Sequence, residues 1–222
     1  PVAWEQVEPV EGRFDFSWVD ALLAAWTDLT GPAVAQTLLA GLGSDDVLFA
    51  GNSNPVRDLD LAPVAGEPPA VFANRGLSGI DGLVSAATGV ALATGRPTHA
   101  LLGDVTLLHD ANALVTGPSE PRPDLRIVVA NDDGGSIFAA LEQGAPPYAA
   151  AFERVFGTPH GLRLDALAEA AGVPFRQAST LAELREAVAH RPAGLELVEV
   201  PVDRARRRDL EQALAGLAPD VP

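Results

Sequence analysis

Two segments of this sequence place carboxylates directly after apolar runs. Asp104 follows the run that ends at Gly103, and the segment Asn131-Asp132-Asp133-Gly134-Gly135 follows a second run. A hard divalent cation takes oxygen ligands, and magnesium keeps near-octahedral geometry, with water and substrate phosphates completing its shell. Two carboxylates from neighbouring segments, a backbone carbonyl and a diphosphate would supply such a shell. The pattern therefore indicates a magnesium and phosphate site.

Each acidic segment also has a structural explanation. Asp104 could cap the helix that follows it, and residues 131–135 could form a turn, because Asp, Asn and Gly favour turns. Taken singly, these structural interpretations are the better ones. The two segments indicate a metal site only as a pair.

Two further polar segments follow apolar runs. One is Gly51-Asn52-Ser53-Asn54-Pro55-Val56-Arg57, and the other spans residues 74–82, with glycines at 76, 79 and 82. Glycine lets the backbone approach a ligand closely, and a helix that begins there could present its N–H groups to an anion. The spacing is not the G-x-G-x-x-G of dinucleotide sites. A tight turn before a close-packed helix would explain it as well.

The elements that must position these segments are short β-branched runs separated by helical patterns. The expected strands are Val47–Gly51, Ala70–Ala73, Thr98–Gly103, Arg126–Ala130, Leu195–Val200 and a weaker one at Val173–Gln177. Several are apolar on both faces, which is typical of parallel strands covered on both sides. The alternation predicts an α/β fold with a doubly wound, mainly parallel sheet and helices on both faces. Ligands in such folds bind at the carboxyl ends of the strands, where the polar segments lie.

Three helices are expected from one-face apolar spacing. The first covers Leu164 to Ala171, the second begins at Thr180 with Glu183 as its capping-box partner, and the third carries Leu210, Leu214 and Leu217. The length of 222 residues suits one domain with an appendage. Residues 16–29 are expected to form a helix within a lead-in segment, 1–30, from a preceding domain, and residues 31–222 to form the domain itself.

The composition excludes several classes of protein. All 15 basic residues are arginine and there is no cysteine, which excludes lysine Schiff bases, P-loop nucleotide sites, disulfides and thiolate metal sites. Thirty acidic residues give a net charge of -15, which disfavours nucleic acid and anionic membranes as partners. The longest small-apolar run, residues 82–95, is too short to span a membrane. A cytoplasmic location is expected.

Two other groups of residues receive no chemical role. The arginines at 204, 206, 207 and 208 are interpreted as the solvated end of a C-terminal helix. The histidines at 99, 109, 160 and 190 are scattered and lack the spacing of metal ligands.

The acidic pair matches the spacing of the thiamine-diphosphate motif, which is Gly-Asp-Gly, a spacer and Asn-Asn. Here Gly103-Asp104-Val105 is followed by 25 residues and then Asn131-Asp132. Val105 replaces the third glycine and Asp132 replaces the second asparagine. Aspartate still offers oxygen to magnesium, so the second change preserves the chemistry and adds a charge.

Three runs strengthen the likeness: residues 74–82 (NRGLSGIDG), 103–114 (GDVTLLHDANAL) and 131–138 (NDDGGSIF). From about Gly43 onward the chain resembles the C-terminal, diphosphate-binding domain of thiamine-diphosphate-dependent enzymes, and most closely those of menaquinone biosynthesis. The resemblance implies the fold of that domain. The implied reaction is decarboxylation of 2-oxoglutarate and 1,4-addition of the resulting succinyl carbanion equivalent to isochorismate.

The resemblance also implies residue roles. Magnesium would be held by Asp104, Asp132 and the Gly134 carbonyl. The cofactor would also contact Ser78, Ile80, Gly103 and Val105, with Ile80 supporting its bent conformation. The substrates would meet Ser53, Arg57, Arg75, Ile137 and Phe138. Structural alternatives are that Arg57 and Arg75 pair with Asp58 or Asp81, and that Phe138 belongs to the core.

The resemblance leaves this chain without a catalytic residue of its own. A glutamate is expected from the N-terminal pyrimidine-binding domain of a second subunit, in a homo-oligomer that is a dimer or a tetramer. Two alternatives stay open, another thiamine-diphosphate 2-oxo acid carboligase and a non-catalytic phosphate-binding domain. A serine hydrolase is less favoured because the sequence has no G-x-S-x-G elbow.

Overall fold

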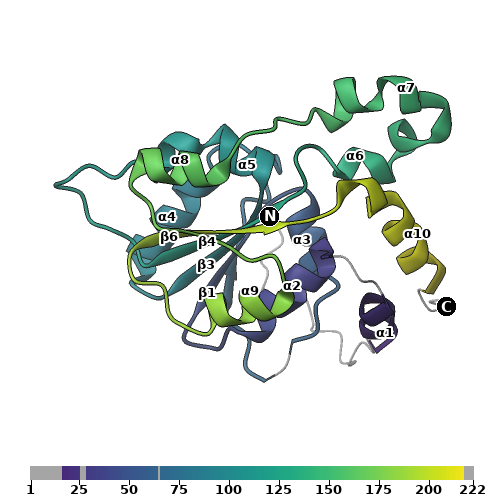
Figure 1. Cartoon of the computed structure of the whole chain (residues 1–222). Coiled ribbons are helices and arrows are strands. Elements are labelled where there is room, and N and C mark those ends of the chain that lie inside the picture. Colours follow the sequence, from purple (N-terminus) through teal and green to yellow (C-terminus); the bar gives the residue numbers. More distant parts are fainter. Residues whose placement is uncertain (1–16, 26–28, 65, 218–222) are drawn as a thin grey trace.

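The computed structural model describes residues 17–25, 29–64 and 66–217. Its centre is a parallel sheet of six strands in the order β2-β1-β3-β4-β6-β5 (Figure 1). The strands are β1 (Val47–Ala50), β2 (Ala70–Phe72), β3 (Thr98–Gly103), β4 (Leu125–Asn131), β5 (Phe175–Gln177) and β6 (Leu195–Pro201). The predicted α/β class and parallel sheet are confirmed, and the strand ends differ from the expected ones by no more than two residues.

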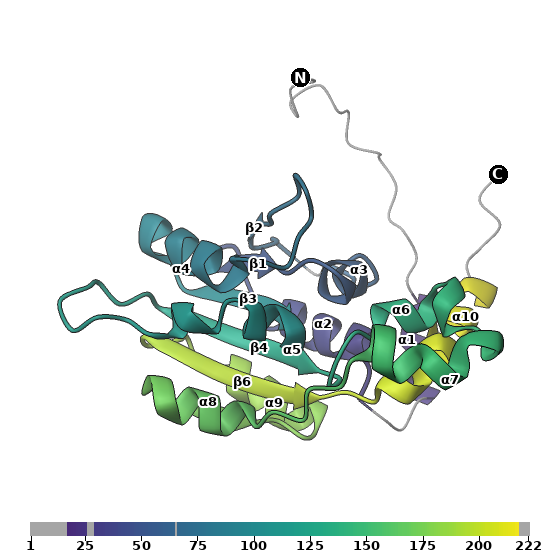
Figure 2. The same cartoon turned by 90° about the horizontal axis from the view of Figure 1, so that it is seen from above.

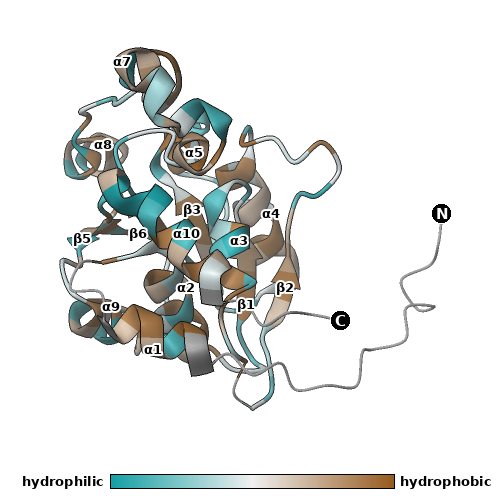
Figure 3. Cartoon of the chain, turned by 90° about the vertical axis from the view of Figure 1, so that its right-hand side faces the viewer, coloured by the Kyte–Doolittle hydropathy of each residue, from teal (hydrophilic) through white to brown (hydrophobic). Residues whose placement is uncertain are grey.

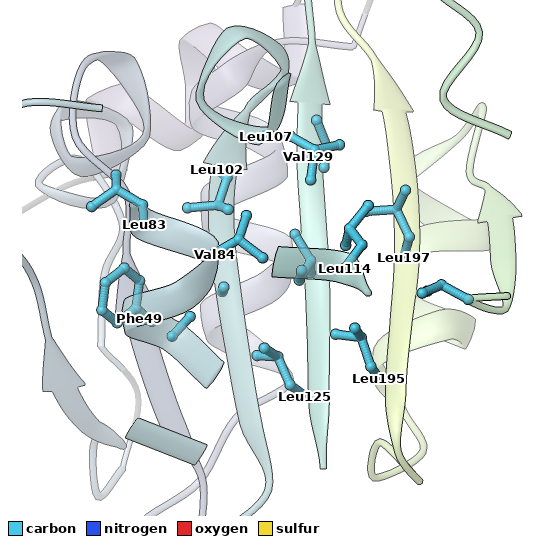
Figure 4. Packing of buried hydrophobic residues seen from close by; sticks show 14 of the residues in the cluster. Phe49, Leu83, Val84, Leu102, Leu107, Leu114, Leu125, Val129, Leu195 and Leu197 are labelled. Atoms are coloured by element: carbon cyan, nitrogen blue, oxygen red, sulfur yellow. The ribbon is translucent and has the colours of Figure 1, made fainter. Parts of the chain in front are cut away.

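Helices cover both faces of the sheet, as Figure 2 shows from above. One face carries α4 (Leu83–Thr94), α5 (Asp104–His109) and α8 (Leu164–Ala171). The other carries α2 (Gly31–Ala40) and α9 (Leu181–Val188). Alternate residues of β1, β3, β4 and β6 contribute to the two cores, because successive side chains of a strand point to opposite faces. Leu102 and Val129 belong to the first core (Figure 4), and Leu101 and Val128 to the second.

The predicted N-cap of α9 agrees with the structure, whereas its capping box is shifted by one residue. Thr180 caps α9, with its side chain accepting a hydrogen bond from the Glu183 N–H at 3.1 Å. The Glu183 carboxylate reaches back to the Ser179 N–H at 2.7 Å, one residue before the position expected for a capping box. Gly172 ends α8 with a left-handed φ of 67°.

Helix α1 (Ser17–Ala25) packs against α10 (Arg207–Leu217) through Val19, Leu210 and Leu214. The helix expected over residues 16–29 is therefore present in its described part. Residues 1–16 and 26–28 and the Leu217 side chain lie outside the described residues. The boundary proposed at residue 30 stays a prediction.

Between β4 and α8 the chain forms short helical pieces that the sequence did not predict. They include α6 (Ile137–Ala140), α7 (Ala149–Phe152) and the π-helix η5 (Glu153–Gly157). These pieces lie beside α10, beyond the carboxyl ends of the strands (Figures 1 and 2). Figure 3 faces that end of the sheet, with α5, α10 and α3 (Asn54–Leu59) gathered in front of it.

The opposite end of the molecule carries a loop over residues 115–124, before β4 (Figure 1). No helix of the described residues is long and apolar enough to cross a membrane.

Candidate functional site

A pocket of about 210 Å³ lies at the carboxyl ends of the strands. Loops after β1, β3 and β4 contribute to this pocket. The pocket lies next to the point between β1 and β3 where the strand order reverses, which is where ligands bind in such folds. Nine of the residues singled out from the sequence line it: Ser53, Ile80, Gly103, Asp104, Val105, Asp132, Gly134, Ile137 and Phe138. The polar segments after three strands are thus brought together, as predicted.

Three predicted site residues, Arg57, Arg75 and Ser78, do not line this pocket among the described residues. The Arg57 side chain folds back and donates to the Ser53 carbonyl at 2.6 Å. Arg75 donates to the Asn52 side-chain oxygen at 2.9 Å, and the Ser78 hydroxyl donates to the Arg75 carbonyl at 3.2 Å. The binding roles of these three residues stay predictions.

Asn52 ties the loop after β2 to the loop after β1. It is buried, and its side-chain amide donates to the Gly79 carbonyl at 2.6 Å while its oxygen accepts from Arg75. Ile80, which follows Gly79, lines the pocket. The alternative pairing of Arg57 and Arg75 with Asp58 or Asp81 is not seen in the described part of the chain.

Asp104 is the first residue of α5, after the extended Gly103, and its side chain is almost fully buried. Its Oδ2 accepts hydrogen bonds from the Gly134 N–H at 2.7 Å and from the His160 ring at 2.7 Å. Burial raises the pKa of Asp104, and the hydrogen bonds from His160 and from the Val105 and Gly134 amides oppose that rise. The carboxylate thus faces the loop after β4, rather than serving only as a helix cap.

Asp132 supplies the second carboxylate. Its Oδ1 is buried and has no hydrogen-bond partner among the described residues. The pKa of Asp132 is raised to about 7, mainly by burial and to a smaller extent by the nearby Asp104 charge. A hydrogen bond from Ser136 lowers this pKa and partly offsets the rise. Two buried carboxylates that repel each other, one with an unpaired oxygen, form a site that a divalent cation would stabilise.

Only glycine fits the backbone conformation and the space at position 134. Its φ is 140°, and a Cβ there would lie 2.0 Å from the Gly157 carbonyl oxygen. Within the described ranges no group of three or more His, Cys, Asp or Glu side chains is arranged to hold a metal. The donor set fits magnesium where a backbone carbonyl and a diphosphate complete the shell.

The other wall of the pocket is apolar. Ile80, Ile137, Phe138 and Phe156 line it, and the Phe138 and Phe156 rings lie 5.6 Å apart at 51°. Phe138 is 37% exposed, so the alternative that it belongs to the core is wrong. An apolar wall facing two carboxylates suits a cofactor with one charged end and one ring end.

The interpretation of the arginine cluster as a solvated helix end was wrong for three of its members. Arg204 donates to the Asp133 carbonyl at 2.6 Å and to the Gly157 carbonyl at 3.1 Å, and pairs with Glu153 at 2.6 Å. Arg208 donates to the carbonyls of Ala139 and Leu141. Their partners lie 47 to 71 residues away in the sequence, which is why local charge patterning could not reveal them.

The third misassigned arginine, Arg207, forms a buried ion pair with Asp58 at 2.8 Å and also bonds Glu211. The Asp58–Arg207 pair joins α3 to α10, and both residues line the pocket. Gly31 makes room for it, since a Cβ there would lie 2.2 Å from Asp58 Oδ2.

His160, which the sequence patterns gave no chemical role, contacts Asp104 in the folded chain. The segment Thr158-Pro159-His160-Gly161 carries no metal-ligand spacing. The contact with Asp104, 56 residues earlier, exists only in the folded chain.

Comparison with known proteins gives one family match. The model described as "Thiamine pyrophosphate enzyme, C-terminal TPP binding domain" matches residues 60–200. This range includes both acidic segments and Ile80.

Curated relatives named 2-succinyl-5-enolpyruvyl-6-hydroxy-3-cyclohexene-1-carboxylate synthase are similar over most of this chain. One from Nocardioides sp. is 50% identical over 206 residues, covering 90% of this chain and 38% of the relative. One from Saccharopolyspora erythraea is 50% identical over 211 residues, covering 95% of this chain and 37% of the relative. The chain thus spans well under half the length of these relatives.

A solved structure has the same fold. Benzoylformate decarboxylase from Polynucleobacter necessarius matches with a TM-score of 0.65 at 23% identity, covering 81% of this chain and 34% of that one.

Proposed function

Since this chain belongs to the thiamine pyrophosphate enzyme family, whose C-terminal TPP-binding domain it carries, we propose that it forms the cofactor-binding part of a 2-succinyl-5-enolpyruvyl-6-hydroxy-3-cyclohexene-1-carboxylate synthase. The proposed overall reaction converts 2-oxoglutarate and isochorismate, with loss of carbon dioxide, in the menaquinone pathway. Relatives of that name at about 50% identity support it. A cytoplasmic location is part of the proposal.

One observation carries the cofactor assignment, the buried pair Asp104 and Asp132 with the unpaired Asp132 Oδ1. These carboxylates and the Gly134 carbonyl would hold magnesium against the cofactor diphosphate. When bound, thiamine diphosphate supplies an electron sink for decarboxylation of a 2-oxo acid. The same cation would compensate two like charges that otherwise share a buried site.

The remaining wall residues have roles that follow from their chemistry. Ile80 would support the ring end of the cofactor, and Ile137 and Phe138 would exclude water from the reacting atoms. Arg57 and Arg75, with Ser53, would bind the substrate carboxylates, because a guanidinium matches a carboxylate in bidentate geometry. In the folded chain each arginine uses one nitrogen for an oxygen of the loop after β1, which leaves further donors available.

A second subunit completes the proposed site. Among the described residues, no glutamate lines the pocket, although six acidic or basic residues do. The glutamate that would protonate the aminopyrimidine would come from the pyrimidine-binding domain of that subunit, in a homodimer or homotetramer. Ser78 and the exposed part of the 74–82 loop would then contact the cofactor at the boundary between subunits.

The experiment uses the full-length synthase and its Asp104→Ala variant. Loss of a hard-ligand charge beside a polyanion should abolish magnesium-dependent binding of thiamine diphosphate, measured by titration calorimetry with and without magnesium. Asp165→Ala is the control, because Asp165 is an exposed residue of α8 that pairs with Arg163. Unchanged cofactor affinity in Asp104→Ala would refute the site.

Product analysis tests the reaction itself. Wild-type protein given 2-oxoglutarate should release carbon dioxide and form the succinylated cyclohexene product only when isochorismate is present. Turnover of another 2-oxo acid in its place would assign the chain to a different carboligase of the same family.

A further inference from the structure

We propose that His160 is a positioning residue for the metal site, holding the Asp104 carboxylate through a hydrogen bond from its Nε2–H. This inference rests on the proposed function, since it takes Asp104 as a magnesium ligand. The observation behind it is the 2.7 Å distance between His160 Nε2 and Asp104 Oδ2, with both side chains largely buried.

The hydrogen-bond network assigns the proton on the imidazole. The Leu162 N–H donates to His160 Nδ1 at 2.9 Å, so Nδ1 is an acceptor and carries no hydrogen. Nε2 therefore bears the hydrogen and donates it to Asp104. The Nδ1 atom also lies 3.4 Å from Asp133 Oδ1, but this is too long for a hydrogen bond. The ring is thus the neutral Nε2–H tautomer.

Hydrogen bonds also fix the main chain around His160. Asp133 Oδ1 accepts from the His160 N–H at 3.0 Å and from the Gly161 N–H at 2.7 Å. Two left-handed residues, Thr158 and Gly161, bend the chain on either side. The histidine is consequently fixed to the same loop after β4 that supplies Asp132 and Gly134.

This arrangement gives Asp104 Oδ2 two donors, the Gly134 N–H of the loop after β4 and the ring of His160, whose backbone is hydrogen-bonded to Asp133 of the same loop. The carboxylate at the end of β3 is therefore oriented by the loop that carries the other metal ligands. Hydrogen bonds that orient a ligating group typically change metal affinity 10- to 100-fold when removed, about the effect expected here.

The same contacts argue against His160 as a direct metal ligand. A neutral imidazole binds a metal through its unprotonated nitrogen, and that nitrogen is used by the Leu162 N–H. The protonated nitrogen points at Asp104. The imidazole acts through the carboxylate rather than on the cation.

The test measures manganese binding to the full-length protein at saturating thiamine diphosphate, by electron paramagnetic resonance of the free ion. The variants are His160→Leu, which removes the donor, and His160→Gln, whose side-chain amide can place an N–H near the position of Nε2. His190→Leu is the matched control, because His190 is exposed and distant from the pocket. Thermal unfolding of each metal-free variant is recorded alongside.

We expect His160→Leu to weaken manganese binding roughly 10- to 100-fold, His160→Gln to recover most of that loss, and His190→Leu to bind normally. Wild-type affinity in His160→Leu would overturn the proposal. Equal losses in His160→Leu and His160→Gln, with unchanged unfolding temperatures, would also overturn it, because the amide donor would then have no effect. Asp104→Ala tests the proposed function separately from the role of His160. Normal binding of manganese and cofactor by Asp104→Ala would refute the proposed function. Loss of that binding would support the proposed function whatever the result for the His160 variants.

Discussion

At the scale of single residues, the proposed site divides into side chains assigned to the cofactor and side chains assigned to the substrates. Asp104, Asp132 and Gly134 are buried or sterically fixed at the pocket. Arg57 and Arg75 do not line the pocket, and each donates one hydrogen bond to the loop after β1. This separation predicts that changes at the arginines affect substrates and leave the cofactor alone.

Arg57→Ala and Arg75→Ala in the full-length enzyme should each lower kcat/KM roughly 10- to 100-fold, because a charge-assisted bond to a carboxylate is worth about 1.5–3 kcal/mol. Lysine should rescue only in part, since it lacks the bidentate fork. Steady-state kinetics for each substrate, with thiamine diphosphate affinity measured in parallel, provide the check. Lower cofactor affinity with normal substrate handling would contradict the assignment.

At the scale of elements, strand β3 carries a buried ionisable residue near its start. His99 lies between Leu48 of β1 and Arg126 of β4, and its Nδ1 has no partner in the described part of the chain. Burial, with a smaller effect of Arg126 and opposition from Asp46, lowers the pKa of His99 to about 4 from an ordinary 6.5. The imidazole therefore stays neutral in the folded chain under mildly acidic conditions in which the unfolded chain is protonated.

The sign of the pH effect follows from that difference. Between pH 6.5 and about pH 4, His99 is protonated in the unfolded chain and neutral in the folded chain, so the unfolded state binds more protons. The free energy of unfolding is therefore not reduced by His99 above the unfolded pKa, and it decreases as the pH falls below that value. Going from about pH 7.5 to about pH 5 should cost the wild type roughly 2 kcal/mol through this residue. His99→Leu should lack that part of the loss, measured by urea unfolding at both pH values. An unchanged pH dependence in His99→Leu would contradict this, and His190→Leu should behave as wild type.

Elements with local sequence signals could be predicted, whereas contacts between distant residues could not. The strands and helices α8 and α9 were predictable because their apolar periodicity and caps are local signals. The acidic pair was predictable because each carboxylate directly follows a strand, and parallel strands end at one edge of the sheet. The contacts of His160 with Asp104, of Arg204 with residues 133, 153 and 157, and of Arg207 with Asp58 were not, because they join residues 47 to 149 positions apart and no local pattern encodes them. The short helices between β4 and α8 were missed because they lack a continuous apolar stripe.

At the scale of the whole molecule, the sheet and its two helical layers form the hydrophobic core, whereas no glutamate of the described residues lines the pocket. Folding and catalysis therefore have different requirements. The described chain contains its own hydrophobic core, whereas the proposed reaction would need a glutamate from another domain.

The purified 222-residue chain should show cooperative unfolding but form no product from 2-oxoglutarate and isochorismate with cofactor and magnesium. The reason is that the proposed proton donor would lie on another domain, whereas the proposed metal ligands lie within this chain. Calorimetry and product detection together check this. Measurable product from the chain alone would show that a residue within it supplies the proton.

The loop over residues 115–124 has a practical consequence. It projects from the end of the sheet opposite the pocket, its Ser119 is exposed, and the chain contains no cysteine (Figure 1). A cysteine introduced at Ser119 would be the only thiol of the chain, and the absence of lysine leaves no side-chain amine to compete for coupling. A dye or a sensor surface attached there would leave the pocket facing solution, so subunit association and cofactor binding could be followed on an oriented, singly labelled protein.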